Sequence, residues 1–151
     1  MPKILHPVAG ALAMILIGTF WLSTVVSELS GDPAFIQTVK TAIPWGFLLL
    51  VPAIATAGGT GVVLSKGRTG GLPGVKLKRM PFIAANGLFI LIPAAFFLAA
   101  KARGGDFDTT FYIVQALELI AGLGNIILLG LNMRDGFRMK GRFRKHPVIK
   151  P

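Results

Sequence analysis

The chain has 151 residues, of which 53% are hydrophobic, and its mean hydropathy is +0.69. Its apolar blocks are too long for the helices of a soluble core, and they leave no room for a separate soluble domain. The chain has no cysteine, which excludes disulfides, iron–sulfur clusters and thiolate zinc sites. Its net charge of +10 would suggest nucleic acid as the partner of a soluble protein, but here basic residues flank apolar blocks.

Four apolar blocks are long enough to cross a bilayer as helices. A hydrocarbon core of about 30 Å requires about 20 helical residues at a rise of 1.5 Å per residue. The blocks cover residues 7–27, 43–64, 81–100 and 110–132. The sequence therefore predicts an all-α integral membrane four-helix bundle over residues 1–133, followed by a basic tail over residues 134–151.

The first block is predicted to remain in the protein as a helix. It is longer than the core of a usual signal peptide, and the sequence SELSGDP that follows it lacks a small-x-small cleavage site. A loop is expected from Glu28 to about Lys40, because Gly31-Asp32-Pro33 is typical of a turn. Within it, Ala34 to Val39 are expected to form either a short interfacial helix or the beginning of a long second helix. This loop would place Lys40 outside the membrane, ahead of the second block.

Small residues recur at every fourth position of the second block. We refer to the four as the small-residue ribbon: Ala53, Ala57, Gly61 and Ser65. Small residues on one helix face allow a second backbone to approach closely. The ribbon is expected to pack against a neighbouring helix of the same chain or, alternatively, against a partner protein or a second copy of this chain.

The basic residues are distributed unevenly between the two sides that four spans would create. The N-terminus, the second connection and the tail hold 13 lysines and arginines, whereas the other two connections hold three. The positive-inside rule therefore predicts that both termini are cytoplasmic, in a cell inner membrane. Trp21, Trp45 and Tyr112 are expected near the outer ends of their helices, in an interfacial aromatic belt.

The second connection and the tail are predicted to contact anionic lipid headgroups. Because the tail adjoins a membrane helix, lipid is a better partner for its basic residues than nucleic acid. The predicted headgroup contacts are Lys66, Arg68, Lys76, Lys78, Arg79, Arg138, Lys140, Arg142, Arg144 and Lys145.

Polar side chains interrupt the fourth block at Gln115, Glu118, Asn125 and Asn132. Their spacing places all of them on one stripe of a helix. Burial in lipid would be costly for such groups, so this polar stripe is predicted to face the bundle interior or a partner. Glu118 is a candidate functional residue, because an intramembrane carboxylate is expensive to retain. The alternative is that Glu118 only joins neighbouring helices by hydrogen bonds.

A b-type haem is one possible cofactor of the predicted bundle. Such a haem takes two axial ligands, commonly His with His or Met. His6 lies at the mouth of the first helix, and Met80 and Met133 lie at the corresponding ends of the third and fourth helices. His6 with either methionine, or two His6 residues across a homodimer, could hold the iron, whereas His146 in the tail is a poor second ligand. No other metal site is predicted.

Three functions are compatible with these features. The leading hypothesis is a non-enzymatic accessory or assembly subunit of a larger membrane complex, because the connections are small and no catalytic set of residues is visible. The first alternative is an electron-transfer protein that binds haem through His6. The second is a small proton-coupled transporter that uses Glu118.

Overall fold

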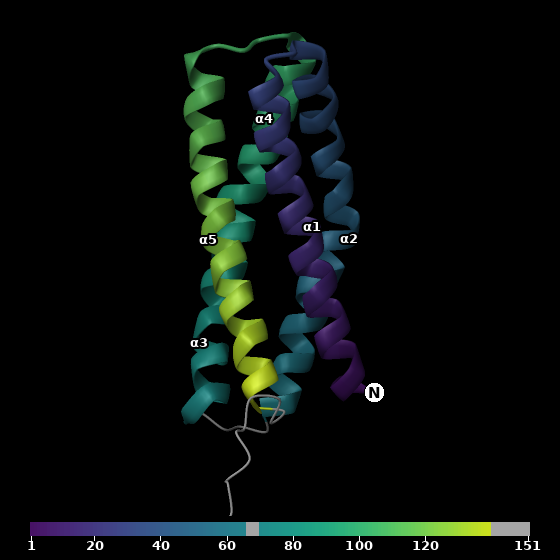
Figure 1. Ribbon diagram of the computed structural model, residues 1–151, viewed down its shortest axis with the longest axis vertical. Helices are drawn as coiled ribbons and strands as arrows, with labels where there is room; N and C mark the ends of the chain where they lie inside the picture. The colour runs from purple at the N-terminus through teal and green to yellow at the C-terminus, as the bar shows by residue number, and fades with distance from the viewer. Residues whose placement is uncertain (66–69, 140–151) are drawn as a thin grey trace, which may run out of the picture.

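The computed structural model describes residues 1–65 and 70–139, and these ranges are almost entirely helical. The elements are α1 (Pro2–Ser30), α2 (Pro33–Ser65), α3 (Gly71–Asn86), the π-helical segment η1 (Gly87–Leu91), α4 (Ile92–Gly104) and α5 (Thr109–Met139). Because α3, η1 and α4 follow one another without a break, they form a third long helix (Figure 1). Four helices are long and apolar enough to cross a membrane, which confirms the predicted all-α membrane bundle.

The long helices run alternately up and down the bundle (Figure 1). The N-terminus lies at one end, which we call the N-terminal end, and the turns at residues 31–32 and 105–108 lie at the other, which we call the turn end. Both α1 and the third long helix pack against α2 and α5. Thus α1 is diagonal to the third long helix, and α2 is diagonal to α5, around a common interior.

At the turn end, a glycine and an aspartate determine the conformation of each turn. Gly31 (φ 65°) and Gly105 (φ 72°) end α1 and α4 in the left-handed region, which favours glycine. Asp32 and Asp108 then accept hydrogen bonds of 3.0 and 2.8 Å from backbone N–H groups in the first turn of the next helix. Each aspartate therefore caps the helix that follows it.

The third long helix changes its hydrogen-bond pattern in its middle, at η1. Pro93 has no N–H group and its ring crowds the preceding turn, so the regular i→i−4 pattern cannot continue through it. The N–H of Ile92 instead bonds to the carbonyl of Gly87, five residues earlier. Single π-helical turns of this kind frequently occur at functional sites.

Two helix boundaries differ from those expected from the sequence. The first connection is shorter than the loop predicted up to Lys40, because the turn needs only Gly31 and Asp32. Of the two alternatives for Ala34 to Val39, the structure has the beginning of a long second helix, since α2 begins at Pro33. Lys40 is consequently a buried residue of α2. At the other end of the chain, α5 continues past residue 133 to Met139, so the first residues of the predicted tail are helical.

The small-residue ribbon packs inside the bundle, against α1. Ala53, Ala57 and Ser65 are buried. A Cβ atom at Gly61 would lie 3.2 Å from the imidazole of His6, a tight contact that the glycine avoids. The absence of side-chain bulk along α2 therefore allows α1 to approach it closely.

Candidate ligand-binding cavity

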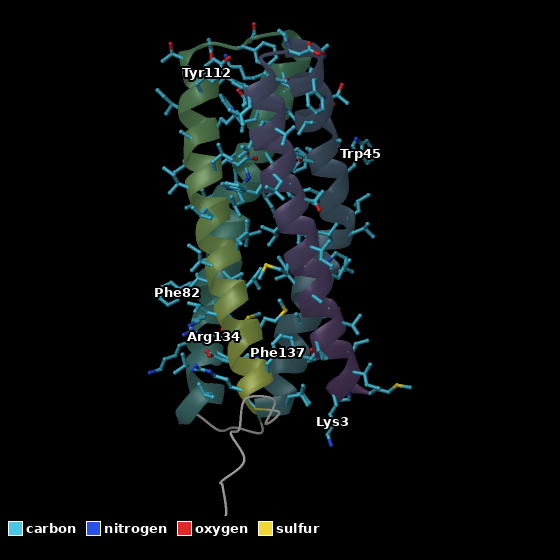
Figure 2. All side chains as sticks on the ribbon, in the orientation of Figure 1. Lys3, Trp45, Phe82, Tyr112, Arg134 and Phe137 are labelled. Carbon is cyan, nitrogen blue, oxygen red and sulfur yellow. The ribbon has the colours of Figure 1, made fainter. Side chains whose placement is uncertain are left out.

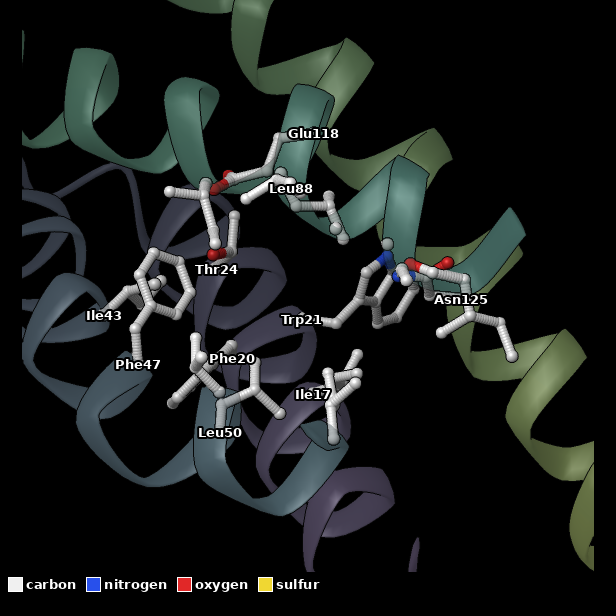
Figure 3. A pocket seen from close by; sticks show the side chains of 18 of the residues that line it. Ile17, Phe20, Trp21, Thr24, Ile43, Phe47, Leu50, Leu88, Glu118 and Asn125 are labelled. Atoms are coloured by element: carbon white, nitrogen blue, oxygen red, sulfur yellow. The ribbon is translucent and has the colours of Figure 1, made fainter. Parts of the chain in front are cut away.

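A cavity of about 310 Å³ lies in the interior of the bundle. Every long helix contributes to its wall, and most of the lining side chains are aliphatic or aromatic (Figure 3). The polar members of the lining are Thr24, Glu118 and Asn125. Its volume is at the lower end of the range found for small-molecule sites, which are likewise apolar with a few polar groups.

The cavity wall nearest the turn end holds a buried ion pair. Lys40 Nζ lies 2.6 Å from Glu118 Oε2, and the two side chains are 1% and 12% exposed. Lys40 also donates a hydrogen bond of 3.4 Å to the hydroxyl oxygen of Thr24. Because α2 and α5 are diagonal, this pair crosses the bundle interior. Each charge neutralises the other at a place where both side chains are largely removed from solvent.

One carboxylate oxygen of Glu118 remains open to a ligand. Glu118 lines the cavity, whereas Lys40 does not. Within residues 1–65 and 70–139, Glu118 Oε1 has no hydrogen-bond partner. In the same ranges, the Thr24 hydroxyl accepts from Lys40 but has no acceptor for its own hydrogen. The wall therefore offers one charged acceptor and one hydroxyl donor beside an apolar space.

Trp21 also lines the cavity, so its expected position in an interfacial belt is wrong. Its indole Nε1 donates a hydrogen bond of 2.9 Å to the carbonyl of Leu119, which turns the ring toward α5. A Cβ atom at Gly122 would lie 3.2 Å from this ring. Trp45 and Tyr112, by contrast, project outward from the upper half of the bundle (Figure 2).

Two asparagines join the third long helix to α5 beside the cavity. Asn86 Nδ2 donates to Asn125 Oδ1 at 2.9 Å and to the carbonyl of Ala121 at 2.8 Å. Asn125 Nδ2 in turn donates to the carbonyl of Ile83 at 3.4 Å. Asn125 is thus a member of the polar stripe whose hydrogen bonds stay within the bundle.

The cavity opens sideways between α2 and the third long helix. Its lining includes exposed residues on both sides of this gap, Val51 and Ala55 on α2 and Ala84 and Leu88 on the third long helix. These residues lie near the middle of their helices and are all apolar. A molecule dissolved in the hydrocarbon core could therefore reach the cavity without crossing a headgroup layer.

A second polar cluster lies at the N-terminal end, away from the cavity. Arg79 Nη1 lies 2.7 Å from Asp135 Oδ2 and donates to Asn132 Oδ1 at 3.4 Å. The amide of Asn132 donates to the sulfur of Met80 at 3.5 Å. Arg134 makes a longer contact of 3.5 Å with Asp135. This network ties α3 to the last turns of α5.

The predicted haem ligands occupy different surroundings. His6 Nδ1 donates to the carbonyl of Ala57 at 2.9 Å, which holds α1 to α2. Met80 accepts the hydrogen bond from Asn132, and Met133 is exposed on α5. A haem bound through these residues stays a prediction.

The predicted headgroup contacts are only partly covered by the structure. Lys78 and Arg138 are exposed, Lys76 is half-buried, and Arg79 is ion-paired with Asp135. The others lie outside the described residues: Lys66, Arg68, Lys140, Arg142, Arg144 and Lys145.

Compared with known proteins, the chain matches no family model, no curated protein and no solved structure. Its class therefore follows from fold and site alone: a small all-α protein with four helices able to span a membrane. These helices surround an apolar cavity bordered by a buried ion pair. Sequence reasoning missed Lys40, although its spacing from the buried Ile36 and Ile43 is typical of one inward helix face.

Proposed function

We propose that the protein binds a lipid-soluble molecule in the cavity and that Glu118 anchors the polar group of that molecule. The observation that carries this proposal is a carboxylate only 12% exposed, with one unpartnered oxygen, at the wall of an apolar cavity. An ionisable group inside a membrane bundle is costly and is by default a candidate for function. Here the ionisable group, Glu118, lines a cavity of about 310 Å³, which is large enough for a ligand.

The chemistry of the wall favours a neutral ligand with a hydroxyl group. Lys40 already neutralises Glu118, so the ligand need not carry a charge. A hydroxyl could donate to Glu118 Oε1 and accept from Thr24, while an aliphatic or aromatic body fills the space between Trp21 and Phe47. The sideways opening toward the hydrocarbon core supports entry from the membrane.

Fluorescence of Trp21 offers a direct test, because this residue lines the cavity. The chain has two tryptophans, so Trp45→Phe leaves Trp21 as the only one. The purified Trp45→Phe protein would be titrated in mild detergent with 10-bromo-1-decanol, whose bromine quenches tryptophan on contact. We expect saturable quenching, at concentrations about 10-fold lower than for 1-bromodecane, since a hydrogen bond to a charged group contributes about 1.5 kcal/mol or more.

Neighbouring alanines on α3 provide a matched pair of variants. Both are exposed, but Ala84 lines the cavity and Ala85 does not. Ala84→Phe should weaken the quenching by filling the opening, and Ala85→Phe should leave it unchanged. Equal quenching in both variants, with no preference for the alcohol over the bromoalkane, would rule out binding in this cavity.

An accessory or assembly subunit is a second proposal. It is supported by the short connections of residues 31–32 and 105–108, which leave little structure at the turn end for a soluble ligand. The ribbon no longer supports it, because these residues pack against α1. Purification in a mild detergent is the test, and a chain that never co-purifies with another membrane protein would count against this role.

A further inference from the structure

Two buried oxygen atoms near the turn end lack hydrogen-bond partners. They are Glu28 Oε1 on α1 and Gln115 Oε1 on α5. The amide oxygen of Gln115 only accepts hydrogen bonds, and so does an ionised Glu28 carboxylate, so neither oxygen can satisfy the other. A buried acceptor without a donor calls for a bound water or an ion. Gln115 is only 4% exposed, so bulk solvent does not supply the missing partner.

The helix register places these two residues at the same level of the bundle. Trp21 on α1 meets Gly122 on α5, where a Cβ atom would lie 3.2 Å from the indole ring. Glu28 and Gln115 each lie seven residues from that contact, toward the turn end on antiparallel helices. Seven residues are about two helical turns, which brings both side chains back to the faces that made the first contact.

The charged side chains near Glu28 and Gln115 sum to one net negative charge. The charged groups of the surrounding helices are Glu28 on α1, Lys40 on α2 and Glu118 on α5. From Ile92 to Ala100, α4 has no charged residue, and its Leu98 packs in the same cluster as Phe111. Among the described residues, the hydrogen bonds of Lys40 go to Thr24 and Glu118. Lys40 therefore pairs with Glu118, and Glu28 has no ion-pair partner among the described residues.

We propose that Glu28 and Gln115 bind a small monovalent cation of the sodium class, at a site distinct from the ligand cavity. A hard cation prefers oxygen ligands, and these two residues supply a carboxylate oxygen and an amide oxygen that have no other partner. One positive charge also cancels the unbalanced carboxylate. A divalent ion would require more carboxylates, and within residues 1–65 and 70–139 no three acidic, His or Cys side chains are grouped so that they could hold a metal ion.

The cation would link α1 to α5 about one helical turn beyond the Lys40–Glu118 pair. Glu28 is four residues from Thr24, and Gln115 is three residues from Glu118, so the two sites are neighbours but share no ligand. The cation should therefore stabilise the folded protein, because it binds the folded state and not the unfolded chain.

Thermal unfolding in mild detergent tests the proposal. The Tm of the protein would be compared in sodium chloride and in N-methyl-D-glucamine chloride at equal ionic strength. We expect sodium to raise the Tm saturably, by about 5 °C. Binding of ²²Na⁺ to the purified protein should saturate near one ion per chain. Gln115→Leu should abolish both effects. Gln37→Leu, which changes an exposed glutamine of α2, should retain them.

A Tm that is the same in both salts, together with no saturable ²²Na⁺ binding, would overturn the proposal. If Gln115→Leu fails to fold, Glu28→Gln provides the second test, because it keeps an oxygen but removes the unbalanced charge. We expect Glu28→Gln to lower the affinity for ²²Na⁺ at least 10-fold. Unchanged affinity in this variant would equally refute the site. Neither measurement depends on quenching by bromodecanol, so the two proposals can fail separately.

Discussion

The two acidic side chains of α5, Glu118 and Asp135, are neutralised in different ways at the two ends of the bundle. Glu118 pairs with Lys40 of the diagonal helix α2, and Asp135 pairs with Arg79 of the adjacent helix α3. Arg79 is 22% exposed, whereas Lys40 is 1% exposed. Asp135 also lies near Arg134, but Glu118 depends on a single cation.

This difference indicates different roles for the two pairs. The pair at the N-terminal end belongs to a hydrogen-bond network near a helix end, and neither Arg79 nor Asp135 lines the ligand cavity. The pair at the turn end stands alone beside an apolar space. A bundle could dispense with such a pair, since replacing a buried ion pair by apolar residues is often neutral or stabilising. Its presence therefore supports a function for Glu118 rather than a purely structural one.

The largest effect is expected when the Lys40–Glu118 pair is broken from one side. Lys40→Met leaves a buried carboxylate without a counter-ion, which should lower the free energy of unfolding by about 3–5 kcal/mol. The double variant Lys40→Met/Glu118→Leu removes both charges and should recover most of this loss. Unfolding of the detergent-solubilised proteins measures both values. A double variant as unstable as the single one would show that the pair is needed for the fold itself.

Breaking the other pair should cost less, because its partners have alternatives. Asp135→Asn removes the charged hydrogen bond with Arg79, and we expect a loss of about 2 kcal/mol in the same unfolding assay. The freed guanidinium group can turn toward solvent because it is already partly exposed. Arg134→Gln is the control, since its contact with Asp135 is long and its side chain is 52% exposed. A loss larger than that of Lys40→Met would reverse the comparison.

The helices of this protein were predictable because a bilayer requires long apolar blocks, and few other structures do. The four blocks stand out from the basic and glycine-rich connections, and the caps at Asp32 and Asp108 follow turn chemistry that is visible in the sequence. The ends of the helices were less predictable. A helix can extend beyond its apolar block, and α5 does so as far as Met139.

The site was less predictable, because its partners are distant in the chain. The position of Glu118 on a polar stripe follows from spacing, but the identity of its partner does not. Lys40 is 78 residues away, on a helix that is diagonal to α5. Lys40 looks like a loop residue when judged by charge alone. Only the register of α2, with Ile36 and Ile43 on the same face, indicates that it points inward.

The smallest effect is expected for the exposed pair of Lys101 and Asp108 at the turn end. Their side chains are 2.6 Å apart, and this hydrogen bond is the main reason that the pKa of the Asp108 carboxyl is below its usual value. A lowered pKa in the folded protein means that the pair stabilises it above the unfolded-state pKa, and that this contribution is lost as the pH falls through the folded-state pKa.

Asp108→Asn isolates that contribution, because asparagine can still cap α5. Solvent screens an exposed pair, so the decrease in Tm at pH 7 should be well below that of Asp135→Asn. The difference in Tm between the wild-type protein and Asp108→Asn should shrink on acidification, as Asp108 of the wild type becomes protonated. A difference that is constant down to pH 3 would mean that the charge of Asp108 contributes nothing, and that burial rather than proximity decides which ion pairs stabilise this bundle.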